Sequence, residues 1–217
     1  LPTMGAFSGP LGAIKFFVRG EVPKDLRETY IRRIRLRAFR PLVPEEDAVE
    51  RVGWCVAGSP LDLALGHESV YFNEYIVLGF RRDKWTIPGA LLKAHFQEQA
   101  RALLASKKKE QLSRTEKADL RMKVTTELKH RLLPSLGSWD LVWNPDRGEA
   151  WFWGRSRAVQ EHLAAHFEST FGLELVPTSP YTVALSRELD ESAAGRLNSL
   201  KPTPLHAERA ERAPEAE

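Results

Sequence analysis

Apolar positions recur in two patterns along this chain, and each pattern predicts a different secondary structure. Runs rich in β-branched and aromatic residues, bounded by glycine, proline or asparagine, are typical of strands. Such runs cover residues 13–22, 51–57 and 74–80, both arms of residues 139–154, and residues 174–185. Apolar residues four apart, between a capping residue or proline and a terminating glycine or proline, are typical of amphipathic helices. This second pattern covers residues 23–39, 88–106, 113–133 and 156–171, and the mixed segment 58–73 is predicted as a loop.

The third of these helices has the most specific start signal. Ser113 and Glu116 form a capping box, in which the serine hydroxyl accepts an orphan backbone N–H and the glutamate reaches back. Leucine and valine then follow at four-residue spacing until Pro134. The basic run Lys107–Glu110, which precedes the capping box, either breaks the preceding helix or continues it.

Residues 139–154 give the clearest hairpin signal in the chain. Two aromatic arms flank the sequence Asn-Pro-Asp-Arg-Gly, where Pro145 fixes its own φ and Gly148 can take the left-handed conformation. Four tryptophans alternate along the arms: Trp139, Trp143, Trp151 and Trp153. Two-residue periodicity is typical of one buried face, so we predict that they pack in a core rather than stack on single-stranded bases.

Together the elements predict an α+β fold, in which antiparallel strands and hairpins pack with about four helices and include one long basic helical segment. The last strand, residues 174–185, contains Pro177 and Pro180, which predicts an edge position. After it the chain has no aromatic residue and is rich in Ala, Glu, Arg and Pro, a composition typical of disorder. We therefore predict an α+β region at residues 1–185, either undivided or with residues 88–135 as a helical subdomain, and a disordered tail at residues 186–217.

The overall composition is ordinary for a folded chain of 217 residues, with 42% hydrophobic and 28% charged residues. Cys55 is the single cysteine, which excludes an intrachain disulfide, fits a reducing compartment and is typical of a buried, inert thiol. No run approaches the roughly 18 apolar residues of a membrane span, and the first ten residues lack the pattern of a secretory signal. We therefore expect a cytoplasmic protein with no membrane partner.

Charge is unevenly distributed, although the whole chain has 32 basic and 29 acidic residues. Residues 24–40 have seven basic and two acidic side chains, and residues 101–131 have ten basic and four acidic ones. The rest of the chain is therefore net acidic. Segregation of this kind is typical of a surface that binds a polyanion, because each neutralised phosphate releases condensed counterions. A solvated helix face is the alternative interpretation of either run by itself.

The third predicted helix presents its basic side chains in a row. Arg114, Lys117 and Arg121 occur at positions i, i+3 and i+7, and three lysines precede them. We expect this row to face solvent, opposite the leucine stripe. We predict that the DNA-binding residues are the following: Arg101, Lys107, Lys108, Lys109, Arg114, Lys117, Arg121 and Lys123. Secondary contributions are expected from Arg32–Arg40 and from Arg81, Arg82 and Lys84.

Signatures of catalysis are sparse. The sequence has no P-loop motif and no HExxH motif. His162 and His166 have a spacing that metal ligands use, but no glutamate lies between them to act as a base. A metal-dependent nuclease would need converging carboxylates, and Asp140, Asp146 and Glu149 lie on one hairpin. We expect no enzymatic activity, no cofactor and no metal, with nuclease activity as a minor alternative.

Three motifs in the centre of the chain carry a resemblance to a known family. They are Trp85-Thr86-Ile87-Pro88 at a helix start, the basic run Lys108–Lys117, and Leu132-Leu133-Pro134 at a helix end. With Val52-Gly53-Trp54 and Leu175-Val176-Pro177, they make residues 13–182 resemble the recombination-associated RdgC family of bacteria. The chain resembles a short member, without the family's usual C-terminal region. Where the family usually has an alanine–phenylalanine pair that serves a ring contact, this chain has Leu136-Gly137.

The resemblance implies a sequence-nonspecific binder of double-stranded DNA. It also implies a homodimer that forms a ring with a basic inner surface, lies on the nucleoid and antagonises recombinase filaments. An alternative that the charge pattern leaves open is an adaptor, whose basic helices dock on an acidic protein partner. Nuclease activity is the remaining alternative.

Overall fold

The computed structural model of the protein describes residues 5–8, 12–185 and 191–199. The chain divides into two compact units, Leu1–Pro177 and Thr178–Glu217. The first unit contains the sheet and helices α1 to α5, and the second contains helices α6 and α7. Residues 186–190 and 200–217 of the predicted tail lie outside the described residues.

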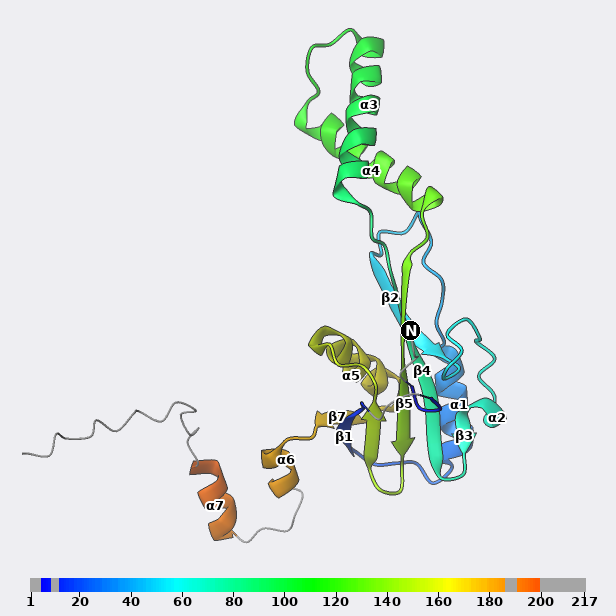
Figure 1. The fold of residues 1–217 in the computed structure, drawn as a ribbon, viewed down its shortest axis with the longest axis vertical. Coiled ribbons are helices and arrows are strands. Elements are labelled where there is room, and N and C mark those ends of the chain that lie inside the picture. The colour runs from blue at the N-terminus through cyan, green and yellow to red at the C-terminus, as the bar shows by residue number, and fades with distance from the viewer. Residues whose placement is uncertain (1–4, 9–11, 186–190, 200–217) are drawn as a thin grey trace, which may run out of the picture. The chain divides into compact units, whose positions relative to one another are not determined.

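The first unit is built on an antiparallel sheet, which confirms the predicted α+β fold (Figure 1). Its strands are β1 (Ile14–Arg19), β2 (Glu50–Cys55), β3 (Tyr71–Phe72), β4 (Tyr75–Lys84), β5 (Ser135–Asn144), β6 (Glu149–Phe152) and β7 (Glu174–Pro177). They lie in the order β2-β4-β5-β6-β1-β7, with β3 paired to β4. The predicted hairpin is the β5–β6 pair, with Gly148 at a φ of 61°, and β7 is an edge strand as predicted.

Two helices, α1 (Leu26–Leu36) and α5 (Arg157–Phe171), cover one face of the sheet and close the main core. Alternate residues of the central strands face these helices, because successive side chains of a strand point to opposite faces. Trp143 of β5 is fully buried, and its ring centroid lies 5.1 Å from that of Phe167 and 5.0 Å from that of Phe171. Tyr30 of α1 packs on Phe171 with centroids 5.0 Å apart, so the two helices share one aromatic cluster.

The four hairpin tryptophans do not share one face. Trp139 and Trp143 point toward the helices, and Trp153 is buried just after β6. Trp151 pairs with Val142 rather than with Trp143, and it therefore points to the opposite face. The prediction of core packing is confirmed for Trp143 and Trp153, and the prediction of one common face is wrong.

Strand β4 is longer than predicted. It pairs with β5 from Ile76 opposite Trp143 to Lys84 opposite Ser135. The sequence predicted a strand only to Phe80, because a run of charged residues has low strand propensity and pairing with β5 overrides it. The segment predicted as a loop, residues 58–73, contains the short helix α2 (His67–Val70) and strand β3.

Gly53 permits a close backbone approach beside β2. A Cβ at this position would lie 2.3 Å from the Cα of Phe39. The chain crosses there because Phe39 N–H donates to Trp54 O at 2.8 Å, and Trp54 N–H donates to Arg37 O at 3.1 Å. Glycine is therefore the residue that fits before Trp54.

The second unit contains two short helices among its described residues, α6 (Pro180–Leu185) and α7 (Glu191–Ser199). The prediction that the last strand continues to residue 185 is wrong, because β7 ends at Pro177. Pro180 fits the first helical position, and Ser179 and Thr182 hold the start of α6. Ser179 N–H donates to Thr182 Oγ1 at 2.7 Å, and Thr182 N–H donates to Ser179 Oγ at 3.1 Å. Helix α7 lies within the predicted tail.

Candidate nucleic-acid interface

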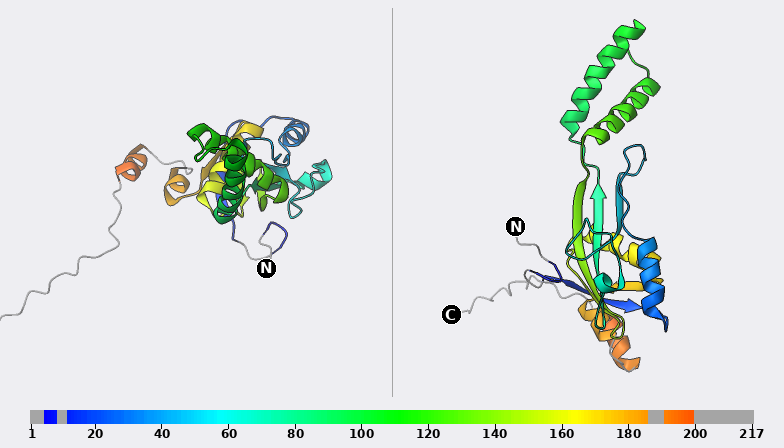
Figure 2. Two further views of the ribbon diagram at one scale, coloured as in Figure 1. Left: turned by 90° about the horizontal axis from the view of Figure 1, so that it is seen from above. Right: turned by 90° about the vertical axis from the view of Figure 1, so that its right-hand side faces the viewer.

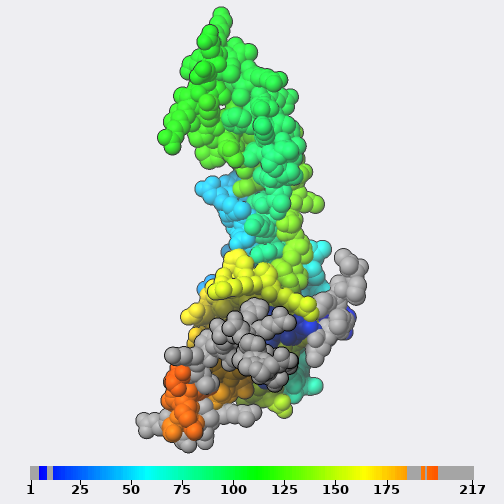
Figure 3. All heavy atoms as spheres, turned by 60° about the vertical axis from the view of Figure 1, so that its left-hand side comes forward, coloured from blue at the N-terminus to red at the C-terminus, as the bar shows by residue number. Residues whose placement is uncertain are grey.

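Helices α3 (Gly89–Lys107) and α4 (Arg114–Arg131) form a hairpin that is inserted between β4 and β5 (Figure 2). Leu120, Val124 and Leu128 of α4 are buried, and partly buried apolar residues of α3 pack against them. Helix α3 has no fully buried residue, so most of the surface of this hairpin faces solvent (Figure 3, green). The hairpin belongs to the same compact unit as the sheet.

The C-terminal end of α4 is attached to the loop before β2. Lys129 is buried, and its Nζ donates to Glu46 O at 2.8 Å. The next residue, His130, has its Nε2 2.9 Å from Glu45 Oε1. Arg51 of β2 pairs in turn with the Glu46 carboxylate. These contacts position α4 relative to the sheet.

Three of the predicted DNA-binding residues form an exposed row on α4. Arg114, Lys117 and Arg121 are all exposed. The prediction that they lie opposite the buried leucines is wrong, because Lys117 and Arg121 are each seven residues, or about two helical turns, before the buried Val124 and Leu128 and so lie on the same side of α4. Among the described residues, no carboxylate forms an ion pair with any of them. The predicted capping box at the start of this helix is confirmed, since Glu116 N–H donates to Ser113 Oγ at 3.2 Å. The row can therefore contact an external anion without breaking an internal ion pair.

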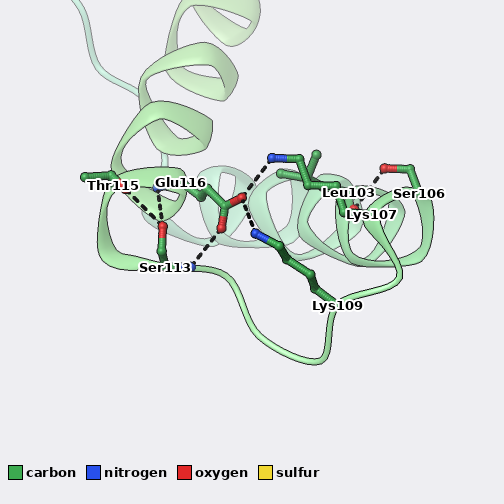
Figure 4. Close-up of polar contacts among 7 residues, drawn as sticks. All are labelled: Leu103, Ser106, Lys107, Lys109, Ser113, Thr115 and Glu116. Carbon is green, nitrogen blue, oxygen red and sulfur yellow. Dashed lines mark hydrogen bonds and ion pairs between the residues drawn. The ribbon is translucent and has the colours of Figure 1, made fainter.

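The lysines between the helices have a different environment (Figure 4). Lys107 Nζ and Lys109 Nζ both donate to Glu116 Oε1, at 2.8 and 3.2 Å. Lys108 lies between them with a φ of 49°, in the left-handed region, and its side chain is exposed. Hydrogen bonds from Lys107, from the Ser113 backbone N–H and from Lys109 lower the pKa of Glu116 to about 2. Two of the three predicted lysines thus have an internal carboxylate partner.

The two remaining candidates, Arg101 and Lys123, also differ in whether a carboxylate lies within ion-pair distance. Arg101 of α3 is exposed, and it has no ion pair within the described ranges. Lys123 Nζ lies 3.9 Å from Glu127 Oε1, one turn further along α4. An exposed pair at this distance is weak. The eight predicted residues therefore lie on one helical hairpin, and its free cations are mainly those of the α4 row.

The basic residues of α1 are exposed, but two of them also hydrogen-bond other parts of the protein. Arg33 Nη1 donates to Phe171 O at 3.1 Å, which joins α1 to the end of α5. Arg35 Nε donates to Leu65 O at 2.7 Å, which joins α1 to the loop before α2. Two of the secondary candidates in residues 32–40 therefore have a structural role.

Arg81, another secondary candidate, is also engaged internally. Its guanidinium forms a two-pronged pair with the buried Asp83, at 2.8 and 2.6 Å. It lies 4.0 Å from the ring centroid of Phe39. Its neighbour Arg82 lies 5.6 Å from the ring centroid of Trp139. Arg81 thus stabilises the sheet face, and it does not extend the row on α4.

The side chains considered for metal binding or nucleophilic catalysis have separate partners. His162 Nε2 lies 3.2 Å from Glu50 Oε1, whereas His166 Nε2 lies 3.2 Å from Arg37 O. In the part of the chain that the structure describes, no group of three potential metal ligands occurs. Cys55 is buried, and burial raises the pKa of its thiol to about 11.

The hairpin carboxylates considered for nuclease chemistry also have structural partners. Asp140 is buried, and its two oxygens accept the backbone N–H groups of Ala6 at 2.8 Å and Gly58 at 3.1 Å. Glu149 pairs with Lys15 at 2.6 Å. The carboxylates on this hairpin therefore do not converge on one point in the described residues.

Sequence reasoning missed the pairing of Glu116 with two lysines. It recognised Glu116 only as a capping residue, because that role depends on local spacing. The ion pairs depend on the path of the connecting loop, which reverses through the left-handed Lys108. The available signal was an acidic helix start close in sequence to several lysines.

No model of a known protein family matches this chain, and no curated protein matches it significantly. The resemblance to the RdgC family therefore stays a prediction from the motifs quoted above. Among the described helices, none combines the length and the apolar composition that crossing a bilayer requires.

Proposed function

We propose that this protein binds double-stranded DNA through the phosphate backbone, without sequence preference and without catalysing a reaction. The observation that carries the proposal is the exposed row of Arg114, Lys117 and Arg121 along α4. Lys108 at the end of α3 is also exposed. Cations in a row can neutralise neighbouring phosphates, and the counterions that are released make binding favourable and salt-dependent. Contacts to phosphates position a protein on DNA but read no bases directly.

The proposal includes a nucleoid-associated homodimer that limits the access of recombinases to DNA. The resemblance to the RdgC family supports this part. A ring contact through a phenylalanine after Leu136 is not included, because the chain has Gly137 there. A Cβ at Gly137 would lie 2.7 Å from Trp139 Cη2, so a larger residue would displace the Trp139 ring.

A salt titration of DNA binding tests the proposal. Fluorescence anisotropy of a labelled duplex, measured from low to physiological salt, gives the slope of log K against log salt concentration. For about six neutralised phosphates we expect a slope of about −5. Changing Arg114, Lys117 and Arg121 together to Gln should weaken binding to all sequences alike and flatten the slope by about 3.

A matched control removes the same charge elsewhere. Arg19, Arg147 and Arg155 are exposed and lie outside the helical hairpin. Their combined change to Gln should leave the slope close to the wild-type value. A wild-type slope near zero, or equal losses in the two triple variants, would contradict the proposal. A single strand of the same length, titrated in parallel, measures the preference for duplex, and sedimentation measures the mass of the assembly.

The same experiments separate the other two functions. An adaptor would capture an acidic protein after nuclease treatment and would not shift the duplex. A nuclease would cleave the duplex in a Mg²⁺-dependent manner, and Asp140→Asn would abolish the cleavage.

A further inference from the structure

Both carboxylate oxygens of Glu116 are occupied. Oε1 accepts from Lys107 at 2.8 Å and from Lys109 at 3.2 Å, and Oε2 accepts the Ser113 N–H at 2.9 Å (Figure 4). The Glu116 side chain is 19% exposed, whereas those of Lys107 and Lys109 are 45% and 53% exposed. The two ammonium groups are therefore at the surface, and the carboxylate that holds them is more deeply placed.

We infer that Glu116 is an affinity-determining residue, whose carboxylate occupies the position between Lys107 and Lys109 that a DNA phosphate would take. This inference rests on the proposed function. Two charged donors converge on one oxygen, which is also how lysines bind a phosphate oxygen. A phosphate must compete with a carboxylate that is already in place. The two lysines therefore contribute to DNA binding only the difference in interaction free energy between a phosphate and the Glu116 carboxylate.

The neighbouring charges indicate that this arrangement is specific to Glu116. Glu110, in the same loop, is exposed and has no ion pair among the residues that the structure describes. Lys108 is exposed and likewise has no carboxylate partner there. Of three consecutive lysines, Lys108 is thus the one that can reach a phosphate without giving up an ion pair.

The test is the substitution Glu116→Gln, measured by the duplex titration described above. Glutamine at the third helical position keeps the capping box, because its side-chain oxygen can still accept the Ser113 N–H. It removes the negative charge and so releases Lys107 and Lys109. At low salt we expect binding to become about fivefold tighter, and the slope to become steeper by up to about 2, or one for each released lysine.

The control is Glu110→Gln, which changes the net charge equally in the same loop but releases no lysine. It should tighten binding by less than about twofold. In the Glu116→Gln background, changing Lys107 and Lys109 to Gln should cancel the gain. In the wild-type background the same two changes should flatten the slope by less than about 1, against about 2 for two unpaired lysines.

The outcomes distinguish this inference from the proposed function. Equal binding by Glu116→Gln and Glu110→Gln, or a gain that survives the loss of both lysines, would overturn the inference and leave DNA binding intact. Absence of duplex binding by every form would overturn both. If Glu116→Gln does not fold, as judged by circular dichroism, the two lysine changes in the wild-type background decide: flattening by about 2 contradicts the inference.

Discussion

At the scale of single residues, Asp140 organises two separate backbone segments. Its carboxylate lies in the sheet and accepts N–H groups from Ala6 and Gly58. A buried carboxylate without such donors would be unfavourable, so these hydrogen bonds hold both segments close to β5. From the sequence, Asp140 was considered as a carboxylate for metal chemistry. An aspartate can bind a metal ion or accept backbone N–H groups, and its position along the chain does not show which partners it has.

Gly53→Ala should destabilise the protein by about 1–3 kcal/mol, because the new Cβ would overlap the backbone of Phe39. Urea unfolding followed by tryptophan fluorescence measures the change. Gly89→Ala is the matched control, since a Cβ at Gly89 would have nothing within 4 Å. Stability of the Gly89→Ala variant should stay within about 0.5 kcal/mol of wild type. Equal effects of the two substitutions would show that the crossing at Phe39 tolerates a side chain.

His166 should make folding stability depend on pH. Burial lowers its pKa from 6.5 to about 4 in the folded protein. Between these values the unfolded chain binds a proton that the folded protein does not bind, so the free energy of unfolding falls as pH decreases from about 6.5 to about 4. Over this range wild type should lose about 2 kcal/mol more than His166→Gln, which cannot take up the proton. Urea unfolding at several pH values measures both curves, and parallel curves would contradict the prediction.

At the scale of elements, helices α3 and α4 were the most predictable parts of the chain. Pro88 before α3 and the Ser113–Glu116 capping box before α4 are local signals, and the structure begins both helices where these signals lie. Residues 180–185 were predicted wrongly for a related reason. Pro180 was taken as an interruption of a strand, although proline is also favoured in the first turn of a helix.

The attachment of the helical hairpin depends on Lys129, which donates to the backbone of Glu46. Lys129→Met keeps a side chain of similar length but removes the donor, and it leaves the Glu46 carbonyl without this bond. We expect a local loss of about 1–2 kcal/mol, seen as faster hydrogen exchange of amides in α3 and α4 but not in β5. Lys123→Met, at an exposed position of the same helix, should not change the exchange. Uniformly faster exchange in the sheet would argue against a local attachment.

At the scale of the whole first unit, the position of β1 was not predictable from the sequence. This first strand lies between β6 and β7, which come from the end of the unit. Pairing over such long separations leaves no local pattern. The two basic runs were also indistinguishable by charge alone. All four of Arg33, Arg35, Arg114 and Lys117 are exposed, but Arg33 and Arg35 donate to backbone carbonyls, whereas Arg114 and Lys117 form no ion pair among the described residues.

The helical hairpin leaves and rejoins the sheet at neighbouring positions, so the order of the strands does not depend on it. Strand β4 ends at Lys84 and β5 begins at Ser135, and these two residues are paired neighbours. Neighbouring strands lie about 4.8 Å apart, so a two-residue turn could close the gap after excision. The fifty intervening residues are therefore an insertion between two paired antiparallel strands. Excision would leave the pairing of β4 with β5 in register, but it would also remove Lys129 and His130, so the loop that contains Glu45 and Glu46 would lose both of these contacts.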